Sequence, residues 1–268
     1  MPKQTTDTDR NFDDLAERFD RNIYGGLKGQ IRLAVLQRDF ADYLPIAPYI
    51  PLTPEGRLRV LDAGGGQGQF SLPLAAAGHD MVFCDISQNM LLKAKARAGA
   101  LGCEQRVEFR HQSAQSLAPA EAFDLVICHA LLEWVVEPMT LLEGLLNRVK
   151  PGGYMSVIFY NQHALVYKNL LRANYKKVLS QDYAAYRGSL TPINPLLPEQ
   201  VRQFCSERKF SLLCCSGIRV FHDYILDAEQ RQAEPESVLQ LELTHSRLAP
   251  YRDLGRYVHL LLRRSAGD

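Results

Sequence analysis

Two hydrophobic periods alternate between residues 57 and 161 of the chain. Apolar runs of strand type occupy residues 57–64, 80–87, 106–113, 123–134 and 150–161. Between these runs, residues 70–78, 88–101 and 138–149 space their apolar positions as amphipathic helices do. Strands joined by short crossover helices indicate a parallel sheet with helices on both faces. The pattern therefore predicts the α/β class.

The segment before the first strand has apolar residues at helical spacing. Ile31, Val35 and Phe40 follow a near-helical period and predict a helix over residues 30–44. A shorter helical piece at 13–19 and a break at 22–29 precede it. The first dozen residues are polar, and we expect them to be disordered.

The pattern changes again after the fifth strand. Helical periods occur at 163–179, 199–206 and 227–247, and strand-like runs at 210–224 and 255–264. We therefore expect a seven-stranded, mostly parallel sheet in one domain spanning residues 1–268. In this organisation residues 1–45 form an N-terminal helical extension, and residues 161–210 form an insertion on the substrate side.

Composition narrows the class of protein. Hydrophobic residues make up 46% and charged residues 23% of the chain, which fits a globular protein. The formal charge of +1 gives no global signal for nucleic acid, although a local basic patch suffices to hold phosphates. The six cysteines form no CxxC pair, so we expect buried thiols and no metal site. The polar start and the lack of a long apolar run predict a cytoplasmic protein without membrane segments.

A glycine-rich stretch, VLDAGGGQGQF at residues 60–70, follows the first strand. A dinucleotide fingerprint starting at Gly64 requires glycine at position 69, where this chain has Gln69. This disfavours an NAD-dependent oxidoreductase. Asp85, at the end of the second strand, can accept hydrogen bonds from both hydroxyls of a ribose, but NAD enzymes use an acid there too.

The spacing D-x-G-x-G-x-G from Asp62 to Gly68, together with Asp85 and the KPGG turn at 150–153, resembles the class I S-adenosylmethionine-dependent methyltransferases. The resemblance implies a Rossmann-like fold and S-adenosyl-L-methionine as cofactor. The cofactor-binding residues that it implies are Arg32, Asp62, Gly64, Gly65, Asp85, Ala114, Gln115 and His129.

A closer resemblance extends over most of the chain. DRNFDDLAERFDRNIYGGLKGQIR near the start, LDAGGGQGQ, FHDY at 221–224 and LGRYVHLLLRR near the end are similar to the bacterial tRNA 5-carboxymethoxyuridine methyltransferases. This resemblance implies methyl transfer to the carboxylate of the modified wobble uridine in the tRNA anticodon loop, giving a methyl ester. A small-molecule O-methyltransferase, acting on a quinone precursor or a fatty acid, and a non-catalytic cofactor- or RNA-binding module stay open as alternatives.

The acceptor side has weaker sequence signals. No [DNS]-P-P-[YF] motif follows the fourth strand, which argues against methylation of base amines and leaves a carboxylate or hydroxyl. The positioning candidates are Tyr160, Arg219, His222 and Tyr224, with Asn161, Arg256 and Tyr257 beside them. Lys168, Arg172 and Lys176, with Lys177 next to them, are spaced to share one helix face, which could meet tRNA phosphates or be a solvated surface. The sequence does not determine the oligomeric state.

Overall fold

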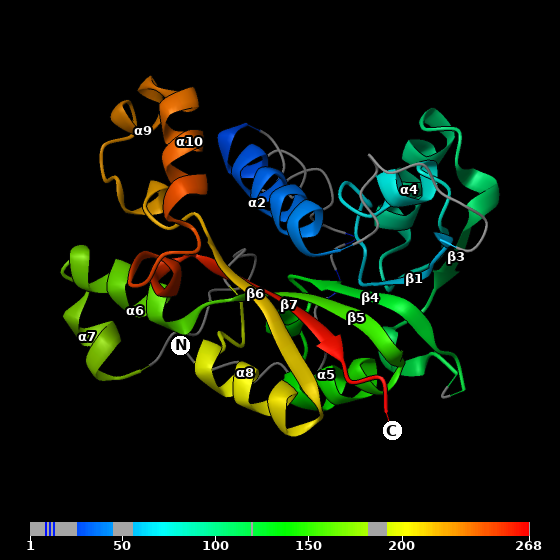
Figure 1. Ribbon diagram of the computed structural model, residues 1–268. Helices are drawn as coiled ribbons and strands as arrows, with labels where there is room; N and C mark the ends of the chain where they lie inside the picture. The colour runs from blue at the N-terminus through cyan, green and yellow to red at the C-terminus, as the bar shows by residue number, and fades with distance from the viewer. Residues whose placement is uncertain are drawn as a thin grey trace.

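The computed structural model describes residues 9, 11, 13, 26–44, 56–118, 120–181 and 192–267. In this part of the chain, seven strands form one sheet in the order β3-β2-β1-β4-β5-β7-β6 (Figure 1). The strands are β1 Arg59–Ala63, β2 Asp80–Asp85, β3 Val107–His111, β4 Phe123–His129, β5 Val149–Tyr160, β6 Phe210–Ile218 and β7 Tyr257–Arg264. β7 pairs antiparallel with β5 and β6, and the other pairs are parallel. The predicted seven-stranded, mostly parallel sheet is confirmed.

Helices cover both faces of the sheet, as predicted. They are α2 Leu27–Tyr43, α3 Leu72–Ala76, α4 Gln88–Ala100, α5 Pro138–Asn147, α6 Gln162–Leu171, α7 Tyr175–Leu179, α8 Pro198–Glu207, α9 Gln230–Ala233 and α10 Pro235–His245. α2, α4 and α10 lie on one face, and α5 and α8 lie on the other (Figure 1). None of the helices in the described ranges is long and apolar enough to cross a bilayer.

The central strands are mostly apolar along their middle residues because both of their faces are buried. In β1, Leu61 packs into the hydrophobic cluster that contains residues of α5 and α8, whereas Val60 packs into the cluster with α3 and α4. Phe83 of β2 is fully buried beside Val60. Parallel strands between two helical layers have this composition, which explains why the alternation of a half-exposed strand is missing here.

Two of the predicted long helices are interrupted. The helix expected over 163–179 ends at Leu171, and Ala173, at φ 54°, turns the chain before α7 begins. Left-handed backbone at a non-glycine residue cannot continue an α-helix. The prediction that Lys168, Arg172 and Lys176 share one helix face is therefore wrong. The helix expected over 227–247 is likewise divided into α9 and α10, with Pro235 at the start of α10.

Two element boundaries also differ from the predictions, and a third prediction is not tested. The break expected at 22–29 is wrong in its last residues, because α2 begins at Leu27. The KPGG turn expected before the fifth strand is instead a bulge within β5, where the register against β4 shifts. The helical piece expected at 13–19 lies outside the described residues except for Asp13.

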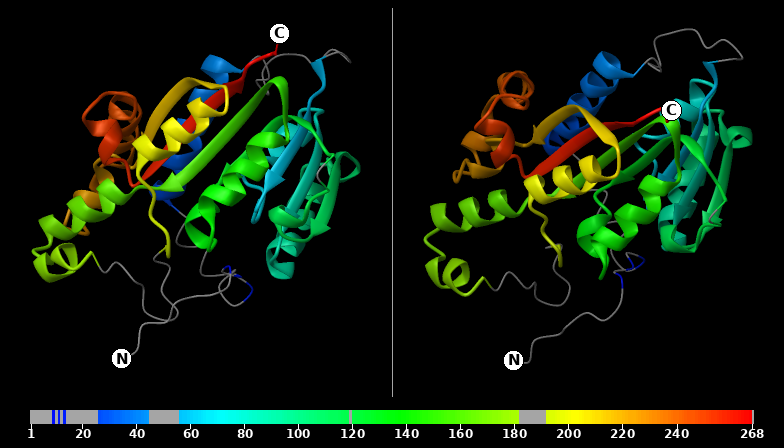
Figure 2. Two further views of the ribbon diagram at one scale, coloured as in Figure 1. Left: turned by 90° about the horizontal axis from the view of Figure 1, so that it is seen from below. Right: turned by 60° about the horizontal axis from the view of Figure 1, so that its bottom comes forward.

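The parallel strands place the candidate residues at one edge of the sheet. β1, β2 and β4 end at the same edge, since parallel strands have their carboxyl ends on one side. Figure 2 shows α6 continuing outward from the end of β5, with α7 beyond it. Residues 161–210, which the sequence marked as an insertion, carry α6, α7 and α8.

Candidate active site

The glycine turn after β1 is a cradle in which side chains do not fit. Gly64 and Gly68 have φ of 68° and 67°, in the left-handed region that favours glycine. A Cβ on Gly65 would lie 2.4 Å from the Phe83 ring and 2.7 Å from Asp62 Oδ2, and a Cβ on Gly68 would lie 2.5 Å from Leu72. The turn therefore presents bare backbone to the space beyond it.

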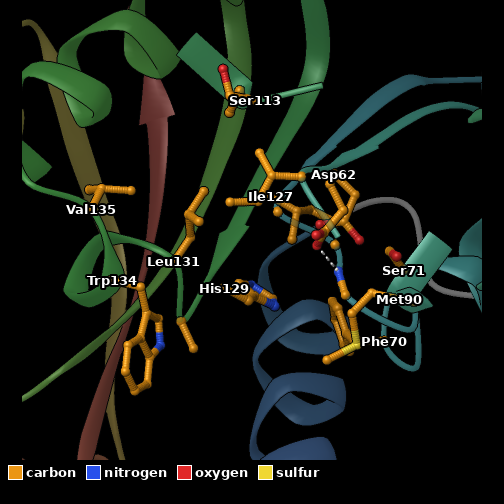
Figure 3. Close-up of a pocket in the computed structure, with 18 of the residues that line it drawn as sticks. Asp62, Phe70, Ser71, Met90, Ser113, Ile127, His129, Leu131, Trp134 and Val135 are labelled. Carbon is orange, nitrogen blue, oxygen red and sulfur yellow. Dashed lines mark hydrogen bonds between the residues drawn. The ribbon is translucent and has the colours of Figure 1, made fainter. Parts of the chain in front are cut away.

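That space is a pocket with an empty volume of about 960 Å³, part of it open to solvent. All eight residues that the resemblance marked for the cofactor line it: Arg32, Asp62, Gly64, Gly65, Asp85, Ala114, Gln115 and His129. In Figure 3, Leu131 and Trp134 lie on one side of His129, and Asp62, Ser71 and Met90 lie on the other. The pocket's size and its mixture of apolar and polar groups are those of a site for a small organic cofactor.

Two carboxyl groups lie at the strand ends. Asp85 Oδ2 accepts a hydrogen bond of 2.8 Å from the Gly66 N–H, and its Oδ1 accepts one of 2.8 Å from the Ser87 N–H. Burial raises the pKa of Asp85. Burial also raises the pKa of Asp62 to about 7, and the nearby charge of Asp85 adds to the rise. Two acids held together in a low dielectric favour a ligand that brings hydroxyl donors and positive charge.

Arg32 and His129 approach the pocket from other elements. Arg32, on α2, is 5% exposed, and its guanidinium carbon lies 4.6 Å from the centre of the Tyr257 ring. His129 ends β4 and packs beside Phe70. Burial, together with the charge of Arg32, holds the pKa of His129 well below its usual value. His129 is therefore a neutral imidazole near pH 7.

Asp9 is one of the pocket residues that the sequence reasoning missed. Asp9 lines the pocket; its Oδ1 accepts a 2.9 Å hydrogen bond from the Val136 N–H, and its Oδ2 accepts one of 2.8 Å from Gln115 Nε2. The expectation of disorder over the first dozen residues is wrong at this position. A lone aspartate in a polar segment carries no periodic signal that could have revealed it.

The four positioning candidates, Tyr160, Arg219, His222 and Tyr224, do not line this pocket. They gather instead around a buried carboxylate, Asp223. Arg219 Nη1 and Arg256 Nε lie 3.6 and 3.7 Å from its oxygens. The charges of these two arginines outweigh burial and hold the pKa of Asp223 well below its usual value. We call Arg219, Asp223, Arg256, Tyr160 and Lys168 the arginine cluster.

Two polar atoms in the arginine cluster have no partner in the described part of the chain. The Tyr160 hydroxyl and Arg256 Nη1 are buried and make no hydrogen bond there. The Arg256 guanidinium carbon lies 4.6 Å from the centre of the Tyr160 ring. Buried polar groups are usually paired, so this pair of donors points to a ligand that supplies the acceptor.

The other candidates serve the structure. Tyr224 donates its hydroxyl to the Leu254 carbonyl at 2.6 Å, and His222 Nδ1 lies 3.2 Å from Asp223 Oδ1. The Asn161 side chain donates to the carbonyls of Asp253 and Gly255 and accepts from the His163 N–H. These side chains hold the loops that carry the arginine cluster, and their polar atoms are already engaged.

Tyr257 connects the arginine cluster to the pocket. Arg32 lies over its ring from the pocket side, and the Arg219 guanidinium carbon lies 5.3 Å from the centre of the same ring. The Tyr160 and Tyr257 rings are 5.4 Å apart and nearly perpendicular. The site thus consists of a cofactor-sized pocket and a cationic cluster, linked by the Tyr257 ring, which contacts Arg32 of the pocket and Arg219 of the cluster.

Comparisons with known proteins agree with this architecture. A family profile described as "Methyltransferase domain" matches residues 60–153. The solved structure of magnesium protoporphyrin IX methyltransferase from Synechocystis PCC 6803, with bound SAH, aligns with a TM-score of 0.59 at 19% identity, covering 95% of this chain and 96% of that chain. The ubiquinone biosynthesis O-methyltransferase of Ruegeria pomeroyi is 37% identical over 101 residues, which are 37% of this chain and 40% of that protein.

The fold, the glycine turn and the domain match define a class I S-adenosylmethionine-dependent methyltransferase. The tRNA 5-carboxymethoxyuridine methyltransferase of Escherichia coli K12 is 40% identical over 258 residues, covering 96% of this chain and 97% of that protein. The chain therefore belongs to the family of bacterial tRNA 5-carboxymethoxyuridine methyltransferases.

Proposed function

We propose that the protein methylates the carboxylate of 5-carboxymethoxyuridine at the wobble position of tRNA, giving the methyl ester. The observation that carries this proposal is the 40% identity to the Escherichia coli enzyme over 96% of the chain. The similarity to the quinone-pathway enzyme covers only 37% of the chain, so it does not account for the segments beyond the shared domain. Because the substrate would be tRNA, we also propose that the protein works in the cytoplasm.

The pocket residues have complementary roles in this proposal. When bound, S-adenosyl-L-methionine supplies an electrophilic methyl carbon and leaves as a neutral thioether. Asp85 would accept the ribose hydroxyls, and Ala114 and Gln115 would lie against the adenine. Asp62 and Arg32 would hold the charged methionine end, and the bare backbone of Gly64 and Gly65 would allow its close approach. The cradle and the two strand-end acids fit this cofactor.

The acceptor requires positioning and needs no base. A carboxylate is ionised near pH 7, so its oxygen can attack without losing a proton. The protein's contribution is to hold that oxygen in line and to exclude water. We propose that Arg256 Nη1 and the Tyr160 hydroxyl donate to the carboxylate, because both are buried donors without a partner in the described residues. Lys168, from the 161–210 segment, adds positive charge beside Arg256 and Arg219.

The proposal is tested by incubating the protein with methyl-labelled S-adenosylmethionine and tRNA. The tRNA is prepared with or without 5-carboxymethoxyuridine. Label should enter only the carboxylate-bearing tRNA and be released by mild base, since esters hydrolyse under conditions that methylamines and methyl–carbon bonds resist. Label that appears only in small lipophilic compounds would instead identify a small-molecule O-methyltransferase.

Lys168 should give the reaction a basic limb in its pH profile. Burial lowers the pKa of Lys168 to about 8, and the neighbouring charge of Arg256 adds to the shift. The side chain is charged below that pH and loses its charge above it, so kcat/KM for tRNA should fall by about tenfold as pH rises through 8. Release of S-adenosylhomocysteine is the measurement, because an ester product hydrolyses in alkali.

Two variants of Lys168 distinguish the titration of this side chain from that of other groups that could shape the pH profile. Lys168→Arg should keep the activity of the neutral range and lose the basic limb, since arginine stays charged. Lys168→Gln should have low activity at every pH. A basic limb of unchanged position in Lys168→Arg would contradict the assignment.

Arg172 and Lys176 are proposed to meet tRNA phosphates, although they lie on different segments. Arg172 follows α6 and Lys176 lies on α7, and both are exposed. Arg172→Glu combined with Lys176→Glu should weaken tRNA binding and reduce the slope of log affinity against log salt by about 2. Cofactor affinity, measured by calorimetry, should not change. An unaltered salt slope would show that these residues form an ordinary solvated surface.

A further inference from the structure

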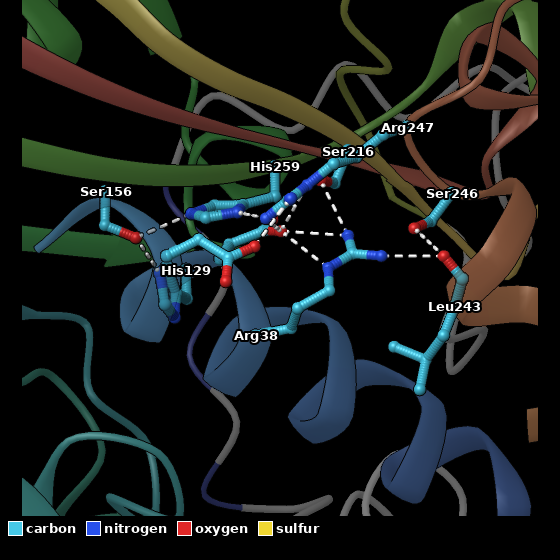
Figure 4. Close-up of polar contacts among 10 residues, drawn as sticks. Arg38, His129, Ser156, Ser216, Leu243, Ser246, Arg247 and His259 are labelled. Carbon is cyan, nitrogen blue, oxygen red and sulfur yellow. Dashed lines mark hydrogen bonds and ion pairs between the residues drawn. The ribbon is translucent and has the colours of Figure 1, made fainter. Parts of the chain in front are cut away.

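A chain of buried polar side chains leads from the protein interior to His129 in the pocket. Asp39 Oδ2 lies 2.8 Å from His259 Nδ1, and His259 Nε2 lies 2.9 Å from Ser156 Oγ. Ser156 Oγ lies 2.7 Å from His129 Nε2. Figure 4 shows Ser156 between the two imidazoles. Because Asp39, His259 and Ser156 are fully buried, these hydrogen bonds do not compete with water.

The serine hydroxyl restricts how protons are arranged along this chain. A hydroxyl has one proton, so Ser156 can donate to only one of its two imidazole partners. The other imidazole must donate its own N–H to the serine oxygen. The states of His259 and His129 are therefore coupled: if one offers a lone pair at Nε2, the other offers an N–H.

The carboxylate at the far end decides between the two arrangements. Arg38 and Arg247 bind Asp39 Oδ1 at 2.9 and 2.6 Å, which leaves Oδ2 for His259. Although burial opposes its charged form, the hydrogen bond from His259 and the charge of Arg38 hold the pKa of Asp39 well below its usual value. An ionised carboxylate only accepts hydrogen bonds, so the proton of His259 is on Nδ1.

The guanidiniums of Arg38 and Arg247 already balance the carboxylates of Asp39 and Asp42, so a further cation on the fully buried His259 would have no negative charge left to compensate it. With its single proton on Nδ1, His259 accepts from Ser156 at Nε2, and Ser156 accepts from His129 Nε2–H. We propose that Asp39, His259 and Ser156 are positioning residues that fix His129 in the Nε2–H tautomer, so that its Nδ1 lone pair faces the cofactor pocket.

A lone pair at this place suits a cationic ligand. His129 Nδ1 makes no hydrogen bond within the described ranges, and His129 lines the pocket. The opposite tautomer would present an N–H, which repels a sulfonium or an ammonium group. The assignment of what meets the lone pair rests on the proposed function, whereas the tautomer itself does not.

The substitution Asp39→Asn should reverse the positions of the protons along these hydrogen bonds. In Asp39→Asn, the amide oxygen should stay with Arg38 and Arg247, which only donate, so the amide N–H₂ should face His259 Nδ1. His259 must then carry its proton on Nε2, Ser156 donates to His129, and His129 becomes the Nδ1–H tautomer. Ser216→Ala is the matched control, because Ser216 is buried and contacts both Arg38 and Asp39 but lies off the path from Asp39 to His129.

The experiment is nitrogen NMR of protein labelled with ¹⁵N-histidine, with His129 assigned from a His129→Asn spectrum. The wild type should show a bare Nδ1 and a protonated Nε2 at His129, unchanged in Ser216→Ala. Asp39→Asn should invert the two signals and weaken S-adenosylmethionine binding about tenfold, as for one hydrogen bond lost. Ser156→Ala should give a mixture of tautomers.

The wild-type spectrum alone shows which of the two imidazoles donates to Ser156, even if a variant fails to fold. A protonated Nδ1 at His129 in the wild type would overturn the proposal. So would an Asp39→Asn protein that keeps the wild-type tautomer, or a Ser156→Ala protein with a single unchanged tautomer. If the spectra are as expected but the wild type does not methylate tRNA, the proposed acceptor is wrong. The role of Asp39, His259 and Ser156 in fixing the tautomer of His129 is then still supported.

Discussion

Replacing Asp85 by alanine should raise the dissociation constant for S-adenosylhomocysteine about 100-fold, which corresponds to roughly 2.7 kcal/mol. Asp85 ends β2 at the rim of the pocket, and among the described residues each of its oxygens accepts one backbone hydrogen bond, from Gly66 or Ser87. Each oxygen therefore keeps a lone pair for a ribose hydroxyl. Isothermal titration calorimetry of the variant and the wild type measures the difference.

Asp124→Ala is the control for a loss of folding rather than of binding. Asp124 also accepts a backbone hydrogen bond, from the Arg59 N–H at 2.8 Å, and it pairs with Lys150, but it does not line the pocket. The Asp124→Ala substitution should lower the temperature of unfolding, while the affinity for S-adenosylhomocysteine stays within about twofold of the wild type. Unchanged affinity in Asp85→Ala would refute the ribose assignment, and equal losses in both variants would point to general loosening.

Much of the fold could be predicted because its signals are local. The strands between residues 59 and 160 are short apolar runs bounded by glycine or by helix caps, and each pattern identifies its element without knowledge of distant residues. The errors occur where the backbone of a single residue departs from the pattern around it. The break at Ala173 is one such place: the run around it has helical spacing, yet its backbone is left-handed.

The two halves of the site were predictable to different degrees. The pocket follows from residues at strand ends, since the topology of a parallel sheet brings Asp62, Asp85 and His129 to one edge. The arginine cluster depends on how the loop after β6 lies against the loop before β7. No hydrophobic period in the sequence predicts that these two loops meet. Sequence reasoning named Arg219 and Arg256 but not Asp223, the carboxylate that organises them.

For the same reason, the sequence did not predict the hydrogen-bonded path from Asp39 through His259 and Ser156 to His129. Asp39, Ser156 and His259 come from α2, β5 and β7, which are separated by more than 100 residues between successive members. Each is a buried polar residue whose local sequence gives no indication of its partner. The pairing of β5 with β7 brings Ser156 to His259, and the packing of α2 on the sheet adds Asp39.

Replacing Arg256 by methionine should lower kcat/KM for tRNA about 100-fold, roughly 2.7 kcal/mol of transition-state stabilisation, and leave cofactor affinity unchanged. The change removes the unpartnered Nη1 that we assign to the acceptor carboxylate, while Asp223 keeps Arg219 and His222 as partners. Arg252→Met is the matched control, because Arg252 is an arginine of the neighbouring loop that pairs with Asp253 outside the cluster.

A second substrate separates contact with the carboxylate from contact with phosphates. Binding is compared for tRNA with 5-carboxymethoxyuridine and for tRNA whose wobble uridine carries a neutral 5-methoxy group. If Arg256 holds the carboxylate, Arg256→Met should weaken only the first complex, since the interaction energy belongs to that pair of groups. If both complexes weaken equally, Arg256 acts on the tRNA backbone, and the carboxylate must be held by another cation of the cluster, for which Arg219 and Lys168 are the remaining choices.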